Sequence, residues 1–307
     1  MRDEAQPGGD ARSLRRAHYP SVQGCHGIAD AATEQIEAWR SVAAGWERRR
    51  DLFARATEQL SGRMVDLLDA QQGDRVLELA AGPGETGFKV LPRIQPDGEL
   101  ISTDGAPEMV EAARRRAASL GLTGVRFAVE DAAHLSLADD AVDRVVCRFG
   151  IMLVPDMEGV ASEIARVLRP GGAAVLAVWA GTRVNPWLTA TGRAAVELGH
   201  MAPPDPEAPG PFRLSDPERL RAVVASGGLV IETVEEVPVS WFAGSLDEWW
   251  EATRDTSRML TSLTERLTPD ETAVLRERAA HNLAAFVQED GSVVTPGVAL
   301  VVLARSR

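Results

Sequence analysis

The sequence predicts an α/β protein with a doubly wound, mostly parallel sheet, and three observations support this fold class. Short apolar runs alternate with helical patterns from residue 74 to residue 180, which is typical of strands joined by helical crossovers. The first apolar run leads directly into a glycine-rich turn at Gly82, Gly84 and Gly87. A Pro170-Gly171-Gly172 segment precedes the last of these runs, as expected where a helix ends before a strand.

The chain is expected to open with an arm and two helices. Residues 1–30 are polar and aperiodic, which predicts a mobile arm. A second helix should cover Glu58–Leu68. The first helix, from Ala31 to Phe53, has an apolar face made of Ile36, Trp39, Ala43, Trp46 and Phe53.

Seven strands are expected along the rest of the chain. Each is a short run rich in apolar residues and bounded by turn residues. They cover Arg75–Leu79, Glu99–Thr103, Val125–Val129, Val142–Cys147, Ala173–Trp179, Leu229–Pro238 and Val298–Ala304.

Helices should connect these strands. One begins at Glu85 after the glycine turn, one begins at Pro107 because proline suits a first helical turn, and one covers Met157–Leu168. After Trp179 the alternation breaks, and the proline-rich residues 202–211 predict a loop. Capping signatures then predict helices opening at Ser215–Glu218, Ser245–Glu248 and Thr268–Glu271, the last within a helical segment that reaches about Gln288.

Composition excludes several classes of function. The net charge of −12 argues against a surface for nucleic acid or anionic membrane. The chain has neither an apolar run of about 18 residues nor the apolar core of a secretory signal. Cys25 and Cys147 are its only cysteines, so a disulfide framework is not expected. We therefore expect a cytoplasmic protein. Lys89 is the only lysine among 33 basic residues, a bias typical of GC-rich bacterial genes.

The stretch from Val76 to Gly87 carries the strongest functional signal. Its glycine spacing fits a nucleotide-like ligand at a helix N-terminus, including a dinucleotide, and it also fits a turn that binds nothing. Glu78 and Glu85 would place negative charge beside a pyrophosphate, which disfavours a dinucleotide. A ligand with cationic groups and no phosphate fits better, and S-adenosylmethionine, with its sulfonium and ammonium groups, is such a ligand.

Acidic residues follow the next two strands. Asp104 can accept both hydroxyls of a ribose, or it is a solvated turn residue. Asp131 can accept an adenine amine while the Ala132 N–H donates to the ring, or it is a surface acid. Met109 packs either on the adenine or in the core of its helix.

The fourth strand ends beside the expected reaction zone. Ligands of doubly wound sheets bind beyond the carboxyl ends of the strands, so Arg148, Phe149 and Met152 should face the pocket. Arg148 can also be an ordinary surface charge.

Together these positions resemble the class I S-adenosylmethionine-dependent methyltransferases. Residues 78–87 resemble the first motif of that family, Asp104 its ribose acid and Glu130-Asp131-Ala132 its adenine motif, while residues 142–147 and 168–172 resemble its later landmarks. The resemblance covers residues 72–180 and is greatest to the branch with the ubiquinone and menaquinone C-methyltransferases and many natural-product methyltransferases. The Asn/Asp-Pro-Pro-aromatic segment of amino-methylating DNA enzymes is absent, since that place reads Arg148-Phe-Gly-Ile.

The resemblance implies a Rossmann-like fold and a transfer of the sulfonium methyl group that needs no metal. It also implies four segments: the arm at 1–30, N-terminal helices at 31–70 that contribute to a substrate lid, the cofactor-binding core at 71–180, and a helical cap with the last strands at 181–307. The expected cofactor contacts are Glu78, Ala80, Gly82, Gly84, Asp104, Gly105, Met109, Asp131, Ala132 and Arg148.

The methyl acceptor is expected to be a small, flat, aromatic molecule such as an indole, a phenol or a quinone. Six of the seven tryptophans lie outside the central motif region, where some fill the core and others suit an aromatic ligand. The expected acceptor contacts are Trp46, Phe149, Met152, Trp187 and Trp249.

Several alternatives stay open at this stage. His134, His200 and His281 are candidate bases, but a lone histidine is more often structural, and none is singled out. A nicotinamide-dependent oxidoreductase and a non-catalytic S-adenosylmethionine-binding protein are the competing functions. A homodimer is possible, and the acceptor and the methylated atom are not determined.

Overall fold

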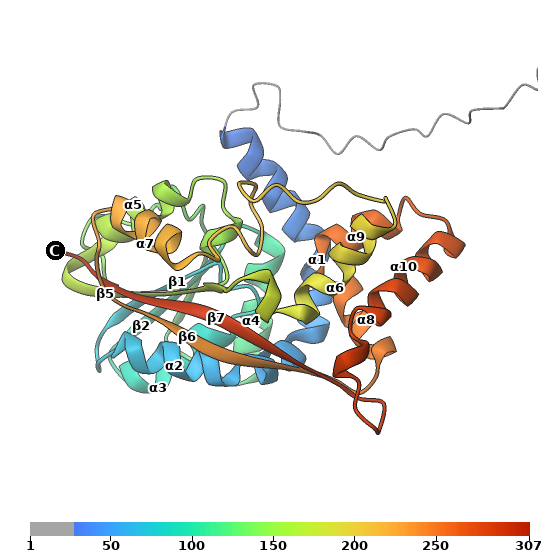
Figure 1. The fold of residues 1–307 in the computed structure, drawn as a ribbon. Coiled ribbons are helices and arrows are strands. Elements are labelled where there is room, and N and C mark those ends of the chain that lie inside the picture. The colour runs from blue at the N-terminus through green and yellow to red at the C-terminus, as the bar shows by residue number, and fades with distance from the viewer. Residues whose placement is uncertain (1–27) are drawn as a thin grey trace, which may run out of the picture.

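The computed structural model describes residues 28–307 of the chain. Residues 1–27 of the expected arm, with Cys25, lie outside the described residues. Residues 28–30 belong to the first helix, which begins at Ile28 rather than at Ala31 and ends at Ala56 rather than at Phe53. The described part is an open sheet with helices on both faces and a helical cap at one end (Figure 1).

The sheet has seven strands in the order β3-β2-β1-β4-β5-β7-β6, and the expected fold class is confirmed. All pairs among the first five strands are parallel, whereas β7 pairs antiparallel with both β5 and β6. The strands are β1 Arg75–Leu79, β2 Glu99–Asp104, β3 Val125–Val129, β4 Val142–Arg148, β5 Leu168–Trp179, β6 Val230–Ala243 and β7 Val293–Arg305.

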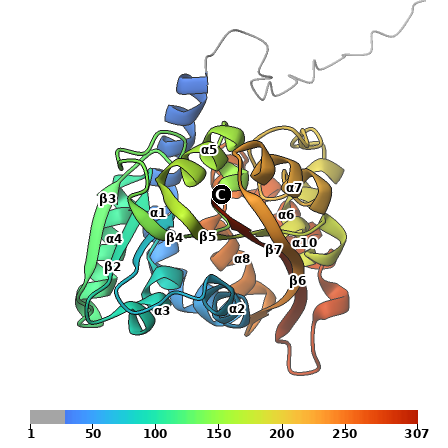
Figure 2. The same cartoon turned by 90° about the vertical axis from the view of Figure 1, so that its left-hand side faces the viewer.

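Ten α-helices lie in the described residues, and the expected helix starts are present. In Figures 1 and 2, α2 and α3 lie below the sheet while α5 and α7 lie above it. The helices are α1 Ile28–Ala56, α2 Glu58–Leu68, α3 Glu85–Ile94, α4 Pro107–Ser119, α5 Met157–Val167, α6 Pro186–Glu197, α7 Pro217–Ser226, α8 Leu246–Thr256, α9 Arg258–Thr264 and α10 Pro269–His281.

Four expected boundaries are wrong by five residues or more. Strand β5 begins at Leu168 rather than Ala173, because the Pro170-Gly171-Gly172 segment lies within the strand beside a register shift in its pairing with β4. The last two strands are longer than expected and stay paired as far as Ala243 and Val293. The last helical segment ends at His281 and is followed by a single 3-10 turn at Ala284–Phe286 rather than reaching Gln288.

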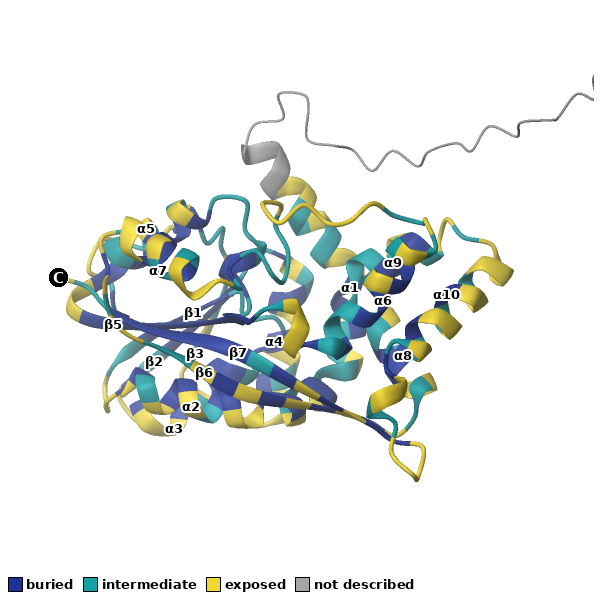
Figure 3. Ribbon diagram, in the orientation of Figure 1, coloured by how far each residue is buried: buried dark blue, intermediate teal, exposed yellow. Residues whose placement is uncertain are grey.

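The core lies on both faces of the central strands. Residues 173–178 of β5 are at most 1% exposed, and β5 and β7 run as buried bands through the molecule in Figure 3. Continuous apolar runs of this kind are typical of strands covered on both faces. Among the described residues, no helix has the length and hydropathy needed to span a membrane.

Candidate cofactor and acceptor site

The sheet order brings the expected cofactor residues to one edge. Strands β3, β2, β1 and β4 are neighbours and parallel, so their carboxyl ends lie side by side. Asp131, Asp104, Ala80 and Arg148 follow or end these strands, and all four are partly exposed. The edge therefore presents two carboxylates and one guanidinium around a glycine turn.

The glycine turn has the backbone that its sequence predicts. Gly82 and Gly84 have φ values of 54° and 90°, and α3 begins at the next residue, Glu85. A Cβ atom on Gly84 would also overlap the ring of Phe88. Two residues with side chains, Ala80 and Phe149, adopt positive φ as well, at 50° and 62°. Such strain in non-glycine residues often marks a functional site, and here it occurs directly after β1 and β4.

Glu78 lies beneath the turn. The residue is only 3% exposed, and its carboxylate accepts hydrogen bonds from the Gly87 N–H at 2.7 Å and from the Ser102 hydroxyl at 3.2 Å. Burial raises the pKa of Glu78 to about 7, against the lowering effect of the Gly87 hydrogen bond and the Arg148 charge. Glu78 therefore holds the start of α3 against β2.

Asp104 is held in place by backbone N–H groups. Its Oδ2 accepts from Gly82 N and its Oδ1 from Ala106 N, each at 2.9 Å. Burial is the main reason that the pKa of Asp104 is raised, and the backbone hydrogen bonds act against it. A carboxylate offers about four lone-pair positions, so each oxygen can still accept a ribose hydroxyl.

The part of the site where adenine is expected, around Asp131 and Met109, is partly covered by α1. Asp131 accepts from Ala133 N at 2.9 Å and contacts His134 Nδ1 at 3.2 Å. Met109 is 3% exposed and packs in a small cluster with Ala43 and Ala106. The structure thus supports core packing of Met109, and its contact with an adenine ring stays a prediction.

Arg148 is only partly exposed to solvent. Its Nη1 donates to the Thr57 hydroxyl, and its guanidinium lies 5.9 Å from the ring centroid of Phe149. Burial lowers the pKa of Arg148, while the charges of Glu78 and Glu85 raise it. Arg148 is therefore a cation within the site rather than an ordinary surface charge.

Beside Arg148 begins an aromatic row, a chain of seven side chains in which each ring contacts the next. Neighbouring ring centroids lie 3.8 to 6.2 Å apart, and the pairs Phe149–Trp179 and Trp187–Trp241 are stacked. Its members, in order, are Phe149, Trp179, Trp187, Trp241, Phe53, Trp46 and Trp39.

Three of the five expected acceptor residues belong to this row: Trp46, Phe149 and Trp187. The other two, Met152 and Trp249, are each 1% exposed and lie in the core. Phe53 and Trp179 were not predicted as acceptor contacts, and Trp241 was considered only as one of the six tryptophans outside the central motif region. For Trp179 a signal was present, because it ends β5 beside the end of β4.

Helix α1 covers this edge of the sheet and joins it to the cap. Ile36 lies close to Gly105, and ion pairs link Arg40 to Glu108 and Glu47 to Arg115 on α4. On its other side α1 crosses α8, where a Cβ atom on Gly45 would overlap the carbonyl oxygen of Asp255.

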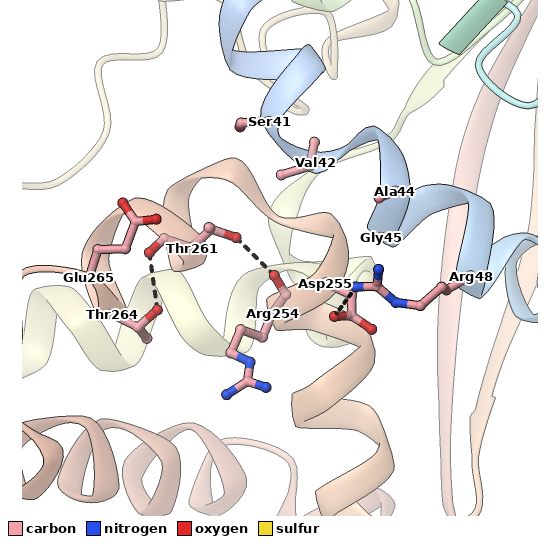
Figure 4. Close-up of a pocket in the computed structure, with 10 residues that line it drawn as sticks. All are labelled: Ser41, Val42, Ala44, Gly45, Arg48, Arg254, Asp255, Thr261, Thr264 and Glu265. Atoms are coloured by element: carbon pink, nitrogen blue, oxygen red, sulfur yellow. Dashed lines mark hydrogen bonds and ion pairs between the residues drawn. The ribbon is translucent and has the colours of Figure 1, made fainter. Parts of the chain in front are cut away.

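Two surface hollows border α1, and neither contains an expected site residue. Figure 4 shows the one between α1, α8 and α9, of about 320 Å³, with Arg48 reaching the Asp255 carboxylate. The other, of about 520 Å³, is lined by Asp51, Ala54, Arg55 and Glu58. Neither hollow is lined by a residue of the aromatic row, whose rings pack against one another.

No candidate base lies in the aromatic row. His134 and His281 are exposed. In the described residues, the His134 ring has a hydrogen-bond contact with Asp131. Cys147 is buried, and burial raises the pKa of its thiol to about 11. The described residues contain no cluster of three or more possible metal ligands.

Comparisons with known proteins agree with the motifs. Residues 76–172 match the family model of a methyltransferase domain. A ubiquinone/menaquinone biosynthesis C-methyltransferase of Pseudomonas savastanoi is 30% identical over 172 residues, which cover 55% of this chain and 66% of that enzyme. An uncharacterized protein of Mycobacterium tuberculosis is 39% identical over 107 residues, which cover 35% of this chain and 38% of that protein. The aligned regions thus span less than two thirds of these curated relatives.

The fold has a counterpart among solved structures. The YcgJ protein of Bacillus subtilis superposes with a TM-score of 0.54 over 80% of this chain and 97% of that chain, at 20% identity. This likeness concerns the fold, whereas the family match concerns the segment that carries the glycine turn and both strand-end acids. Most of the aromatic row lies outside the matched residues.

Proposed function

Because the chain carries a class I S-adenosylmethionine-dependent methyltransferase domain, we propose that it transfers the methyl group of S-adenosylmethionine to a small, flat, aromatic acceptor. The observation that supports the proposal most directly is that two sets of residues lie at neighbouring strands of the sheet. Glu78 in β1, Asp104 at the end of β2 and Asp131 just after β3 lie near a turn suited to a cationic nucleoside, and the aromatic row begins after β4, with Phe149.

The residues present fit the cofactor. Asp104 keeps lone pairs for the ribose. Of the cations near the turn, Arg116 pairs with Glu85 and Lys89 with Glu58, whereas Arg148 lies at the end of β4 and donates to the Thr57 hydroxyl. A phosphate at the turn would lie beside the carboxyl groups of Glu78 and Glu85, which disfavours its negative charge. A sulfonium and an ammonium group would instead be attracted to them. Bound S-adenosylmethionine would supply an electrophilic methyl group.

The protein's own contribution is alignment and exclusion of water. The aromatic row would hold a flat ring in line with the methyl group, and α1 would keep water out. Arg148, expected from the sequence as a cofactor contact, would instead hold an anionic or carbonyl oxygen of the acceptor, which would favour the reactive, deprotonated form of a phenol or enol. A histidine base is not needed in such a reaction.

A direct test supplies S-adenosylmethionine with a deuterated methyl group and a panel of flat aromatic acceptors. Mass spectrometry should find one CD3 group in the acceptor and an equal amount of S-adenosylhomocysteine. The Asp104→Ala and Asp104→Asn variants should bind S-adenosylhomocysteine roughly 10- to 100-fold more weakly, because hydrogen bonds to a charged group are lost. Asp97→Ala removes an exposed acid and should change nothing. Unchanged affinity in both Asp104 variants would remove the ribose role.

A second candidate function is binding of S-adenosylmethionine without catalysis. The observation that favours it is the closed acceptor side, where α1 and the aromatic row pack ring against ring. Tight cofactor binding with no labelled product from small molecules, peptides or nucleic acids would support this alternative.

A further inference from the structure

We propose that the buried face of the ribbon formed by β6 and β7 is the specificity-determining part of the acceptor site. This face would take uncharged, planar ring compounds that carry a carbonyl or ring-ether oxygen at one edge. The inference rests on the proposed function, because it names the class of acceptor that the aromatic row receives.

The ribbon has two very different faces. Beyond the main sheet, the paired residues alternate between buried and exposed, so that Trp241 and its partner Thr295 point inward while Phe242 and Val294 point outward. The buried face consists of Val237, Val239, Trp241, Ala243, Val293, Thr295, Gly297 and Ala299. None of these eight residues is charged, so the face does not favour an ionic ligand.

Three polar groups at this face have no hydrogen-bond partner. They are the indole N–H groups of Trp187 and Trp241 and the hydroxyl of Thr295. The three residues are 5%, 2% and 0% exposed. Burying an unpaired donor is unfavourable, and most buried polar groups in native proteins are paired. Three such groups on one small surface therefore indicate that a ligand supplies their acceptors.

The neighbouring Asn185 shows that the fold can satisfy polar groups here. Its Oδ1 accepts from Val298 N at 3.0 Å, and its Nδ2 donates to Ala180 O and Val298 O. Next to it, Gly297 offers no side chain, and a Cβ atom there would lie 3.2 Å from the indole nitrogen of Trp187. The unpaired indole N–H of Trp187 thus lies beside a position where the ribbon has no side chain.

The donors define the chemistry of the ligand. Indole N–H groups only donate, and the Thr295 hydroxyl can also donate, so they select accepting oxygens. Stacking partners are already in place, because Trp241 stacks on Trp187 with centroids 4.3 Å apart. A planar ring with an oxygen at its edge can both accept these hydrogen bonds and stack on an indole ring, whereas a hydrocarbon ring of the same shape can only stack.

Helix α1 controls access to this face. Phe53 of α1 packs edge-on against Trp241, with centroids 4.7 Å apart, and takes the place where the ligand ring would lie. The Arg40–Glu108 and Arg115–Glu47 pairs that link α1 to α4 are partly exposed to solvent, and ion pairs at the surface contribute little to stability. A displacement of α1 would uncover Trp241 without breaking the sheet.

Thr295→Val tests the proposal, because it replaces the hydroxyl with a methyl group of the same shape. The free protein should become more stable, with a rise of about 2–4 °C in its unfolding midpoint, since an unpaired buried hydroxyl is removed. Thr256→Val is the matched control, because the buried Thr256 hydroxyl donates to Ala252 O. Its midpoint should fall or stay unchanged.

The same variants are then titrated with two probes in saturating S-adenosylhomocysteine. Coumarin carries edge oxygens, and naphthalene is a bicyclic ring of similar shape without them. Calorimetry should show coumarin binding at least about fivefold more weakly to Thr295→Val than to the wild type, with naphthalene unaffected. Trp241→Phe should weaken coumarin binding in the same direction.

The outcomes separate this inference from the proposed function. A destabilised Thr295→Val would mean that the hydroxyl has a partner, and equal coumarin affinity in wild type and variant would mean that the ribbon does not bind the acceptor. Either result overturns the inference, as does a wild type that binds no coumarin. Neither result bears on methyl transfer, which the labelled-cofactor assay measures independently.

Discussion

Glu78 carries a carboxyl group that burial keeps close to its half-protonated state at neutral pH. Its folded pKa is raised to about 7 from an ordinary value of 4.5, so the native state binds the proton more tightly than the unfolded chain does. Stability from this group is present at low pH and is lost as pH rises from about 4.5 through 7. The whole effect amounts to roughly 3 kcal/mol.

Glu78→Gln should remove this pH dependence. The free energy of unfolding in urea, measured between pH 5 and 8, should fall with rising pH more steeply in the wild type than in the variant. Taking the difference between the two proteins cancels the other titrating groups. Parallel curves would show that Glu78 titrates normally. Cofactor binding should tighten over the same range, because a cationic ligand favours the ionised carboxyl.

At the residue scale, acids at strand ends could be predicted and the full aromatic row could not. Asp104 and Asp131 follow from the rule that parallel strands end together, and the structure places them at one edge. Trp241 meets Phe53 and Trp187 only because β6 extends beyond the sheet and α1 and α6 fold back over it. No local pattern in the sequence encodes contacts between segments about 190 residues apart, such as Phe53 and Trp241.

Among the helices and strands, α1 is the element that covers the acceptor side of the proposed site. Its sequence pattern predicted an apolar face, and Ala43 and Phe53 on that face are buried. The pattern did not indicate Gly45, where the α1 backbone lies against the last turn of α8 (Figure 4). Trp46 Nε1 donates to Thr256 O at 3.1 Å beside this crossing, so one turn of α1 contacts both the aromatic row and the cap.

Gly45→Ala should therefore destabilise the protein. Alanine favours a helix over glycine by up to about 1 kcal/mol, but its Cβ would overlap the Asp255 carbonyl, and such overpacking costs roughly 1–3 kcal/mol. Gly62→Ala in α2 is the matched control, because a Cβ there has no neighbour within 4 Å. That variant should be more stable by about 0.5–1 kcal/mol. Urea unfolding measures both. Equal stabilisation of the two variants would show that α1 does not pack against α8 in solution.

At the scale of the whole molecule, the alternation of strands and helices predicts the parallel part of the sheet but not the end that carries the cap. Strands β1 to β4 lie within a residue of their expected bounds, because each is a short apolar run between strong turn signals. The insertion of β7 between β5 and β6 is set by pairing across more than 100 residues. The pairing of β7 with β6 also forms the ribbon that we propose as part of the acceptor site.

The whole fold should respond to its ligand, and this response separates the methyltransferase from the oxidoreductase alternative. A ligand at 100 times its Kd stabilises the native state by about 2.7 kcal/mol, which corresponds to a rise of about 5 °C in Tm for a domain of this size. S-adenosylhomocysteine should give this rise and NAD none, because Glu85 stands in the first turn of α3 and pairs with Arg116, so a pyrophosphate there would meet an acid. Asp104→Ala is the control, since a 10- to 100-fold weaker affinity should reduce the rise to about 1–3 °C at the same ligand concentration. A rise with NAD but not with S-adenosylhomocysteine would reverse the assignment, because the glycine turn would then hold phosphates despite its acids.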